Sequence, residues 1–304
     1  MKRRFVAYPY LLPGFIGLLM TTLVPVGYSI YIAFTNYSTK HLFDYSFIGL
    51  ANFQRILIGI DQKNFLTVFT WTMEWTVITT LLNFSVALFL AILLNNPRLH
   101  ERNVYRTILI YPWALPATLT IMAWAGLLNN SFGPVNQLLG SFGISAIPWL
   151  TDPNWAKVSC IIVNLWLAYP FLMSVCLGAL QSIDPCLNEA AAIDGANKRQ
   201  IFWHITMPLL RAATMPVLII SFANNFSGFG VIYLLTGGGP VMGIDPRTPG
   251  ATDLLSTWMY RLAFGDVSKL YGVAAATGII IFIFVGALTL INSALTGSLN
   301  KVEA

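Results

Sequence analysis

Few side chains able to do chemistry lie within the long apolar stretches of this sequence, and the clearest of them are amides. Asn164 falls in one such stretch. Another contains Asn224 and Asn225, with Ser221 one helical turn before Asn225. An amide both donates and accepts hydrogen bonds, so these residues can bind a hydroxyl-bearing solute or bond neighbouring helices to each other. Catalysis would need a nucleophile with a base, or a paired acid, and the stretches contain no such His, Asp or Cys constellation. The residues therefore favour binding over catalysis.

Glu74 is the only acid inside an apolar stretch. It could serve a proton or cation relay, but no second buried acid or histidine accompanies it, and it lies between Trp71 and Trp75 in one half of its stretch. We therefore interpret it as accessible to water or to a partner subunit. The cysteines and histidines show no metal-ligand spacing and suggest no metal site or disulfide framework; they are Cys160, Cys176, Cys186, His41, His100 and His204.

The composition places these residues in a membrane. Hydrophobic residues make up 56% of the 304 residues and charged residues only 10%, which excludes a water-soluble domain. Six stretches nearly free of charge are each long enough to cross a hydrocarbon core of about 30 Å as a helix. They are residues 8–34, 66–94, 107–127, 158–180, 212–235 and 271–295. We therefore predict an all-α, polytopic membrane protein with six transmembrane helices, forming a single domain over residues 1–304.

Lysine and arginine are unevenly distributed over the connections between these stretches. One side carries most of them: Lys2, Arg3, Arg4, Arg98, Arg102, Arg106, Lys198, Arg199, Arg211 and Lys301. The positive-inside rule places that side, and with it both termini, in the cytoplasm. This bias accounts for the net charge of +5, so the charge is no evidence for nucleic acid binding. The first stretch is too long for a signal-peptide core, and we expect it to be retained as a helix.

The connections on the opposite side contain two segments with helical patterns. Residues 47–53 form an aromatic and apolar run, for which we expect a short helix at the membrane interface. Residues 252–262 place apolar side chains at helical spacing, so we expect an amphipathic helix lying on the outer surface. The run at residues 236–240 contains three glycines, which permit backbone conformations closed to other residues.

The connection at residues 184–210 is longer than two adjacent helices require, and it predicts two short helices. Asp184 suits an N-cap, and Pro185 suits the first helical turn. Gly195 is expected to end the first short helix in a left-handed conformation. The second short helix is expected to break at Pro208.

Parts of that connection resemble the EAA loop of binding-protein-dependent ABC importer permeases: Glu189-Ala190-Ala191, Asp194-Gly195-Ala196 and Ile205-Thr206-Met207-Pro208-Leu209-Leu210. Residues 164–170, 235–240 and 252–264 resemble the carbohydrate-uptake branch of that family, and most of all its larger maltose/maltodextrin permease subunits. The resemblance covers roughly residues 60–296 and implies the ABC type I importer permease fold. The best-studied members carry further N-terminal helices and a large external domain that have no match here, so contacts made by that domain are not carried over.

The resemblance implies that the loop couples the membrane helices to a cytoplasmic ATPase. Its first short helix is expected to sit in a groove of the ATPase, with Glu189 as the charged contact and Gly195 as the bend between the short helices. The implied coupling residues are Glu189, Ala190, Ala191, Asp194, Gly195 and Pro208. The alternative is an ordinary amphipathic loop helix lying on the membrane.

The resemblance also implies a sugar site midway across the membrane, formed by the fourth and fifth stretches. The implied residues are Asn164, Leu167, Ala168, Phe171, Ser221, Asn224, Asn225 and Gly228, and Trp113 of the third stretch is a further candidate. Amides can bond sugar hydroxyls, and aromatic faces can pack on pyranose C–H groups. The alternative is that the amides only bond neighbouring helices. Ala168 and Gly228 replace larger or more polar side chains of the family, which leaves the size of the cavity open.

The sequence has no GxxxxGK[ST] loop, so ATP and magnesium are expected on a separate ATPase and no cofactor is expected on this chain. The expected partners are a second homologous permease subunit, two cytoplasmic ATPase subunits, an extracytoplasmic sugar-binding protein, the sugar and the lipid of a prokaryotic cytoplasmic membrane. One rival is an ion-driven secondary transporter, for which a lone Glu74 is thin support, and another is a membrane-embedded hydrolase or transferase.

The charge of the solute can be argued from the same stretches. No Lys or Arg lies within them, whereas a phosphorylated or carboxylated solute would favour a cationic partner. A neutral solute is therefore preferred. Maltose or a maltodextrin is the first expectation, with trehalose, cyclodextrin or another oligosaccharide as competitors.

Overall fold

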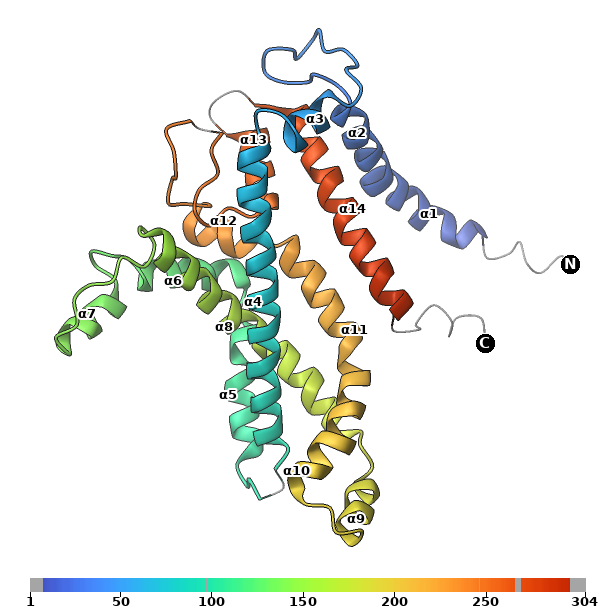
Figure 1. Ribbon diagram of the computed structural model, residues 1–304, viewed down its shortest axis with the longest axis vertical. Coiled ribbons are helices and arrows are strands. Elements are labelled where there is room, and N and C mark those ends of the chain that lie inside the picture. Colours follow the sequence, from blue (N-terminus) through green and yellow to red (C-terminus); the bar gives the residue numbers. More distant parts are fainter. Residues whose placement is uncertain (1–7, 97, 246, 266–268, 296–304) are drawn as a thin grey trace, which may run out of the picture.

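The computed structural model describes residues 8–96, 98–245, 247–265 and 269–295. The helices are α1 (Tyr8–Leu18), η2 (Leu19–Leu23), α2 (Val24–Ala33), α3 (Ala51–Leu57), α4 (Gln62–Leu94), α5 (Arg102–Ala114), α6 (Ala117–Leu127), α7 (Pro134–Ser141), α8 (Pro153–Gln181), α9 (Pro185–Ile193), α10 (Lys198–Ile201), η3 (Phe202–Thr206), α11 (Met207–Phe226), α12 (Gly230–Thr236), α13 (Leu255–Phe264) and α14 (Tyr271–Leu295). The described residues include isolated β-bridges but no strand, so the predicted all-α class is confirmed. Figure 1 shows α9 and α10 at one end of the molecule and α3 and α13 toward the other. The basic residues Lys2, Arg3, Arg4 and Lys301 lie outside the described residues.

Within the described ranges, five helical segments are long and apolar enough to cross a membrane: Tyr10–Ala33, Gln62–Leu94, Pro153–Gln181, Lys198–Thr236 and Tyr271–Leu290. The remaining predicted span, residues 107–127, is not one straight helix, because α5 and α6 meet at a bend of 92°. Leu115, between them, is extended at φ −86° and ψ 146°, since a residue before proline avoids the helical region. Counted as one span, this bent pair brings the total to six.

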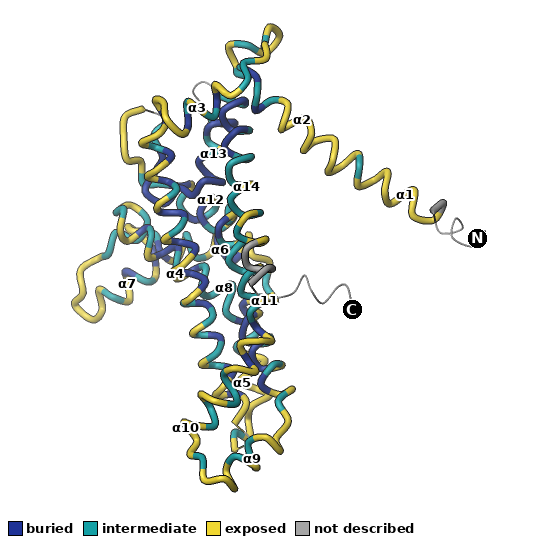
Figure 2. Tube along the Cα trace, turned by 45° about the vertical axis from the view of Figure 1, so that its right-hand side comes forward, coloured by how far each residue is buried: buried dark blue, intermediate teal, exposed yellow. Residues whose placement is uncertain are grey.

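Helix α4 lies at the centre of the bundle and packs against α8, α11 and α13. In one half, the small side chains of Ala87 and Ala91 are fully buried beside Met173 of α8, which allows the helices to approach closely. In the other half, Trp71 and Trp75 pack with residues of α6, α8 and α12. Figure 2 shows the buried residues concentrated around α4, α12 and α13.

The first apolar stretch extends away from this bundle. It runs through α1, the π-helical turn η2 and α2, and between residues 10 and 33 only Ala33 is buried. Outside this first stretch, the main helix contact of α2 in the described residues is with α14, and both views show α1 projecting outward (Figures 1 and 2). Its apolar side chains therefore need lipid or another protein to cover them.

The helix predicted for residues 252–262 exists, but the prediction that it lies on the outer surface was wrong. Leu255 and Trp258 of α13 are fully buried, and the helix packs against α14 and α4. The indole N–H of Trp258 donates to the Arg247 carbonyl at 3.0 Å, so its polar atom is satisfied within the fold. The apolar spacing thus marks a helix buried between neighbours.

The short helix predicted near residues 47–53 begins later than expected, at Ala51. Gly49 precedes it in a left-handed conformation, with φ +59°. Asn52 is buried and donates to the carbonyls of Ala33 and Thr35, both at 2.8 Å. These bonds tie α3 to the end of α2.

An ion pair anchors the loop before α13. Arg261 bonds the Asp253 carboxylate at 2.9 Å and the Gly237 carbonyl at 2.9 Å. Gly238 has φ +81°, and a Cβ there would overlap the Asp253 carboxylate, which confirms the conformational role predicted for the glycine run. Burial raises the pKa of Asp253 to about 6, although the charge of Arg261 opposes the shift.

Candidate functional site

The two amides singled out from the sequence both bond α4. Asn83 donates from Nδ2 to Oδ1 of Asn164 on α8 at 2.9 Å. Asn225 of α11 donates from its own Nδ2 to the hydroxyl oxygen of Thr80 at 3.0 Å. Thr80 and Asn83 are three residues apart on one helix, which is a rise of roughly 4.5 Å. The fold therefore brings Asn164 and Asn225 to nearly the same level of the bundle.

These bonds engage only one side of each amide. Nδ2 of Asn164 and Oδ1 of Asn225 have no protein partner among the described residues, and neither is among the buried unpartnered atoms. Both residues are half-buried. Interhelical bonding and solute binding are thus compatible, because each amide keeps one accessible group.

The other solute candidates also keep accessible surface. Leu167, Ala168, Ser221 and Gly228 are half-buried, whereas Asn224, Phe171 and Trp113 are exposed. Trp113 of α5 and Phe171 of α8 come together, with ring centroids 6.0 Å apart and planes at 37°. The pair offers an apolar surface on which a sugar ring can pack.

The helix that carries Asn225 breaks directly after it. α11 ends at Phe226 and α12 starts at Gly230, although the sequence predicted one continuous stretch over 212–235. The break is held by side chains: the Trp75 indole donates to the Asn225 carbonyl at 3.2 Å, and the Ser256 hydroxyl donates to the Gly228 carbonyl. Each bond gives a carbonyl at the break a side-chain donor, and the Asn225 carbonyl also accepts the Gly228 N–H at 3.1 Å. An added Cβ on Gly228 would lie 3.0 Å from the Asn225 carbonyl oxygen, so the site has little room for a larger residue there.

The predicted coupling loop forms its first short helix as expected. The Asp184 carboxylate accepts the Cys186 N–H at 2.9 Å as an N-cap, and Pro185 opens α9. Gly195 ends this turn with φ +87°, which confirms the predicted left-handed conformation. No residue of α9 is buried, and Glu189 is exposed.

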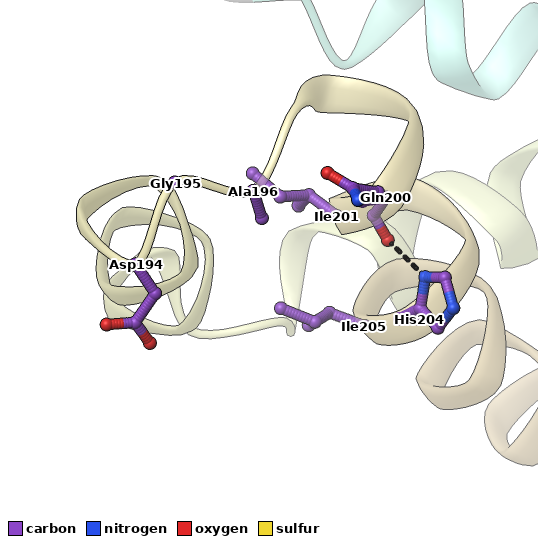
Figure 3. Close-up of a pocket in the computed structure, with 7 residues that line it drawn as sticks. All are labelled: Asp194, Gly195, Ala196, Gln200, Ile201, His204 and Ile205. Atoms are coloured by element: carbon purple, nitrogen blue, oxygen red, sulfur yellow. Dashed lines mark hydrogen bonds between the residues drawn. The ribbon is translucent and has the colours of Figure 1, made fainter.

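A hollow of about 380 Å³ lies between the two arms of this loop. Figure 3 shows Ile201 and Ile205 reaching toward it from one arm and Ala196 from the connection, whereas the Asp194 carboxylate points away. His204 Nδ1 lies 3.0 Å from the Gln200 carbonyl. The loop thus presents an apolar concavity beside an exposed helix.

Pro208 does not break the second short helix, so that prediction was wrong. α10 continues through the π-helical turn η3 into α11, and Pro208 occupies the first turn of α11. The wider turn accommodates a proline that lacks the N–H for a regular helical bond. The predicted coupling loop is therefore joined to the span by continuous helix rather than by a hinge at this proline.

Comparison with known proteins decides the family. Residues 84–299 match the family described as binding-protein-dependent transport system inner membrane component. The chain belongs to this family. It is therefore a permease, the membrane component of a transport system that depends on a binding protein, rather than an enzyme.

Relatives of this permease include named oligosaccharide transporters. It is 39% identical over 287 residues to the galactooligosaccharides transport system permease protein GanP of Bacillus subtilis, covering 91% of this chain and 67% of that protein. It is 44% identical over 250 residues to the maltose/maltodextrin transport system permease protein MalF of Salmonella typhimurium, covering 81% of this chain and 48% of that protein. The permease thus spans about half the length of this MalF.

A solved structure shows the same fold. The permease superposes on a bacterial ABC transporter involved in the import of the acidic polysaccharide alginate with a TM-score of 0.81 and 25% identity. The match covers 98% of the permease and 96% of the other chain. The predicted ABC importer permease fold is confirmed.

Two residues of this site were missed from the sequence, Thr80 and Asn83. The available signal was a row of polar side chains at helical spacing on one face of the second apolar stretch: Thr72, Thr76, Thr79, Thr80 and Asn83. All five are buried against neighbouring helices. Polar side chains in a membrane span are expected on such a face, because exposing them to lipid would be unfavourable.

Glu74 lies on the other face of the same helix. It is nine residues from Asn83, which is two and a half turns, so the two side chains point to opposite sides of α4. Glu74 is exposed on this chain, and it lies away from both solute amides. No group of three or more His, Cys, Asp or Glu that could hold a metal occurs in the described part of the chain.

Proposed function

We propose that this permease forms half of the membrane path of an ATP-driven importer for a neutral oligosaccharide. A second homologous permease subunit completes the path, two ATPase subunits bind ATP and magnesium, and a sugar-binding protein delivers the solute. Maltose or a maltodextrin is the first candidate, because the relatives include maltose/maltodextrin permeases. A galactooligosaccharide is the second, because GanP is a comparably similar relative.

The observation that carries this proposal is that Asn164 of α8 and Asn225 of α11 lie at nearly the same level of the bundle, each bonded to a residue of α4. Asn164 offers an accessible N–H donor and Asn225 an accessible oxygen, on helices held together by Thr80 and Asn83. The Trp113 and Phe171 pair adds aromatic surface from α5 and α8. Amide hydrogen bonds combined with aromatic stacking suit a sugar, which has both hydroxyls and an apolar ring face.

The absence of cations from the candidate site supports a neutral solute. No Lys or Arg lies in residues 158–180 or 212–235, which supply most of the candidates. An acidic sugar in the middle of a membrane would favour a cationic partner. The proposal therefore differs in solute charge from the alginate importer with the same fold.

The arrangement of α9 supports its role as the contact with the ATPase. The helix has no buried residue and Ile193 is 86% exposed, so much of its surface is left uncovered by the described residues of this chain. Glu189 adds a charge to the same short helix. Helix α10, which carries Lys198 and Arg199, lies toward the same end as α9 (Figure 1), which supports a cytoplasmic location for this end; a total of six spans, an even number, then puts both termini on that side of the membrane.

Uptake by reconstituted complexes tests the solute site. The two substitutions Asn164→Leu and Asn225→Leu each remove hydrogen-bonding capacity at similar size. Because a hydrogen bond contributes about 0.5–1.5 kcal/mol, each should lower maltose uptake roughly 2- to 12-fold. Asn154→Leu, at the exposed end of α8, is the matched control and should transport normally. Normal uptake by both site variants would remove the amides from the sugar site, and faster uptake of galactobiose than of maltose by the native complex would favour the second candidate.

A further inference from the structure

The buried polar row of α4 contains two kinds of side chain. Thr76 and Thr79 are fully buried, and each hydroxyl donates to a carbonyl of its own helix, at 2.6 Å in both cases. Thr80 and Asn83 are also buried, with exposures of 8% and 2%, but they bond side chains of other helices. Within this polar row, only these two bond side chains of α8 and α11.

The bonds fix which group each amide presents to the path. An asparagine carries its oxygen and its NH₂ on opposite sides of one carbon, so engaging one group turns the other away. Asn83 engages the oxygen of Asn164 and leaves its NH₂ accessible. Thr80 engages the NH₂ of Asn225 and leaves its oxygen accessible. One amide then offers a donor and the other an acceptor.

Asn83 carries a feature that packing alone does not explain. Its own Oδ1 is buried and has no hydrogen-bond partner in the protein. Such an orphaned oxygen is unfavourable, and a leucine of similar size would fill the same space without it. The contribution of Asn83 must therefore come from the N–H that it donates to Asn164.

We propose that Thr80 and Asn83 are positioning residues of the sugar site, which orient Asn164 as a donor and Asn225 as an acceptor toward sugar hydroxyls. The inference rests on the proposed function and deepens it. Neither residue touches the sugar; each acts through the amide that it holds. Because each sugar hydroxyl can both donate and accept, the orientation selects sugars with hydroxyls placed within reach of the donor and of the acceptor, and so contributes to specificity beyond the shape of the cavity.

The experiment uses the complete transporter, reconstituted with its ATPase and binding protein, and maltose as the probe. The test variants are Thr80→Val, which removes the hydroxyl at constant shape, and Asn83→Leu. Thr80→Ser retains the hydroxyl and should restore function. Thr76→Val and Thr79→Val are the matched controls, because they remove equally buried hydroxyls that bond only α4.

We expect Thr80→Val and Asn83→Leu to lower maltose uptake per ATP hydrolysed roughly 2- to 12-fold, as loss of one oriented hydrogen bond predicts. The half-saturating concentration of maltose-loaded binding protein should stay unchanged, because docking occurs elsewhere. The preference for maltose over its monodeoxy analogues should also decline, which a merely structural role would not cause. Thr80→Ser and both control variants should match the native transporter.

The inference is overturned if Thr80→Val transports and discriminates like Thr76→Val, or if Thr80→Ser is as impaired as Thr80→Val. Should one test variant fail to assemble, the other decides by the same criteria. Failure of the proposed function looks different: Asn164→Leu and Asn225→Leu would then transport normally. Impaired Asn164→Leu and Asn225→Leu beside normal Thr80→Val and Asn83→Leu would refute the positioning role alone.

Discussion

Gly195 is the residue at which the coupling loop turns, and a valine there should impair coupling without unfolding the loop. Its φ of +87° is one that residues with a side chain rarely adopt, whereas no atom lies within 4 Å of an added Cβ. The penalty of Gly195→Val is therefore conformational rather than a clash, and amounts to about 1–2 kcal/mol. That energy shifts the ratio of native to rearranged loop by roughly 5- to 30-fold.

The assay follows retention of the ATPase during purification and sugar-stimulated ATP turnover in reconstituted vesicles. We expect both to fall for Gly195→Val and to recover partly for Gly195→Asn, because asparagine tolerates the left-handed region. Gly143→Val is the matched control: it has φ +74° and no atom within 4 Å of its Cβ, but it follows α7, away from α9 (Figure 1). Equal retention and turnover for Gly195→Val and Gly143→Val would refute the coupling role.

Three further predictions concern charge and topology. Glu189→Lys should weaken ATPase retention while leaving the permease in the membrane, because it reverses the charge on an exposed helix; unchanged retention on co-purification would argue against docking at α9. An impermeant thiol reagent applied from outside should label Ile244→Cys, where the native side chain is fully exposed, and miss Lys198→Cys; labelling of both would overturn the orientation. Because burial raises the pKa of Asp253 from 3.8 to about 6, its ionised form costs folding stability. The native permease should therefore lose up to about 3 kcal/mol relative to Asp253→Asn as the pH rises from about 4 to about 6, measured as melting temperature in detergent, and a pH-independent difference would contradict this.

The membrane location, the helical class and the short helix that ends at Gly195 could be predicted from the sequence because they rest on local properties. Apolar stretch length, the N-cap at Asp184 and the left-handed glycine at Gly195 each depend on a few neighbouring residues. The candidate amides Asn164 and Asn225 were recognisable for the same reason, since polar groups are conspicuous within apolar stretches. The 92° bend at Pro116 also has a local cause, but an apolar stretch does not reveal whether a proline bends a span or is accommodated, as Pro208 is.

Contacts between distant parts of the chain were decided only by the tertiary structure. Apolar spacing predicted a helix near residue 258 but not what would bury it, because packing against α14 and lying on a membrane demand the same pattern. Thr80 and Asn83 looked like any polar residues of a span until the fold placed them against Asn225 and Asn164, 145 and 81 residues away. A hydrogen bond depends on the positions of both partners in space, and helical periodicity determines only the face on which each one lies.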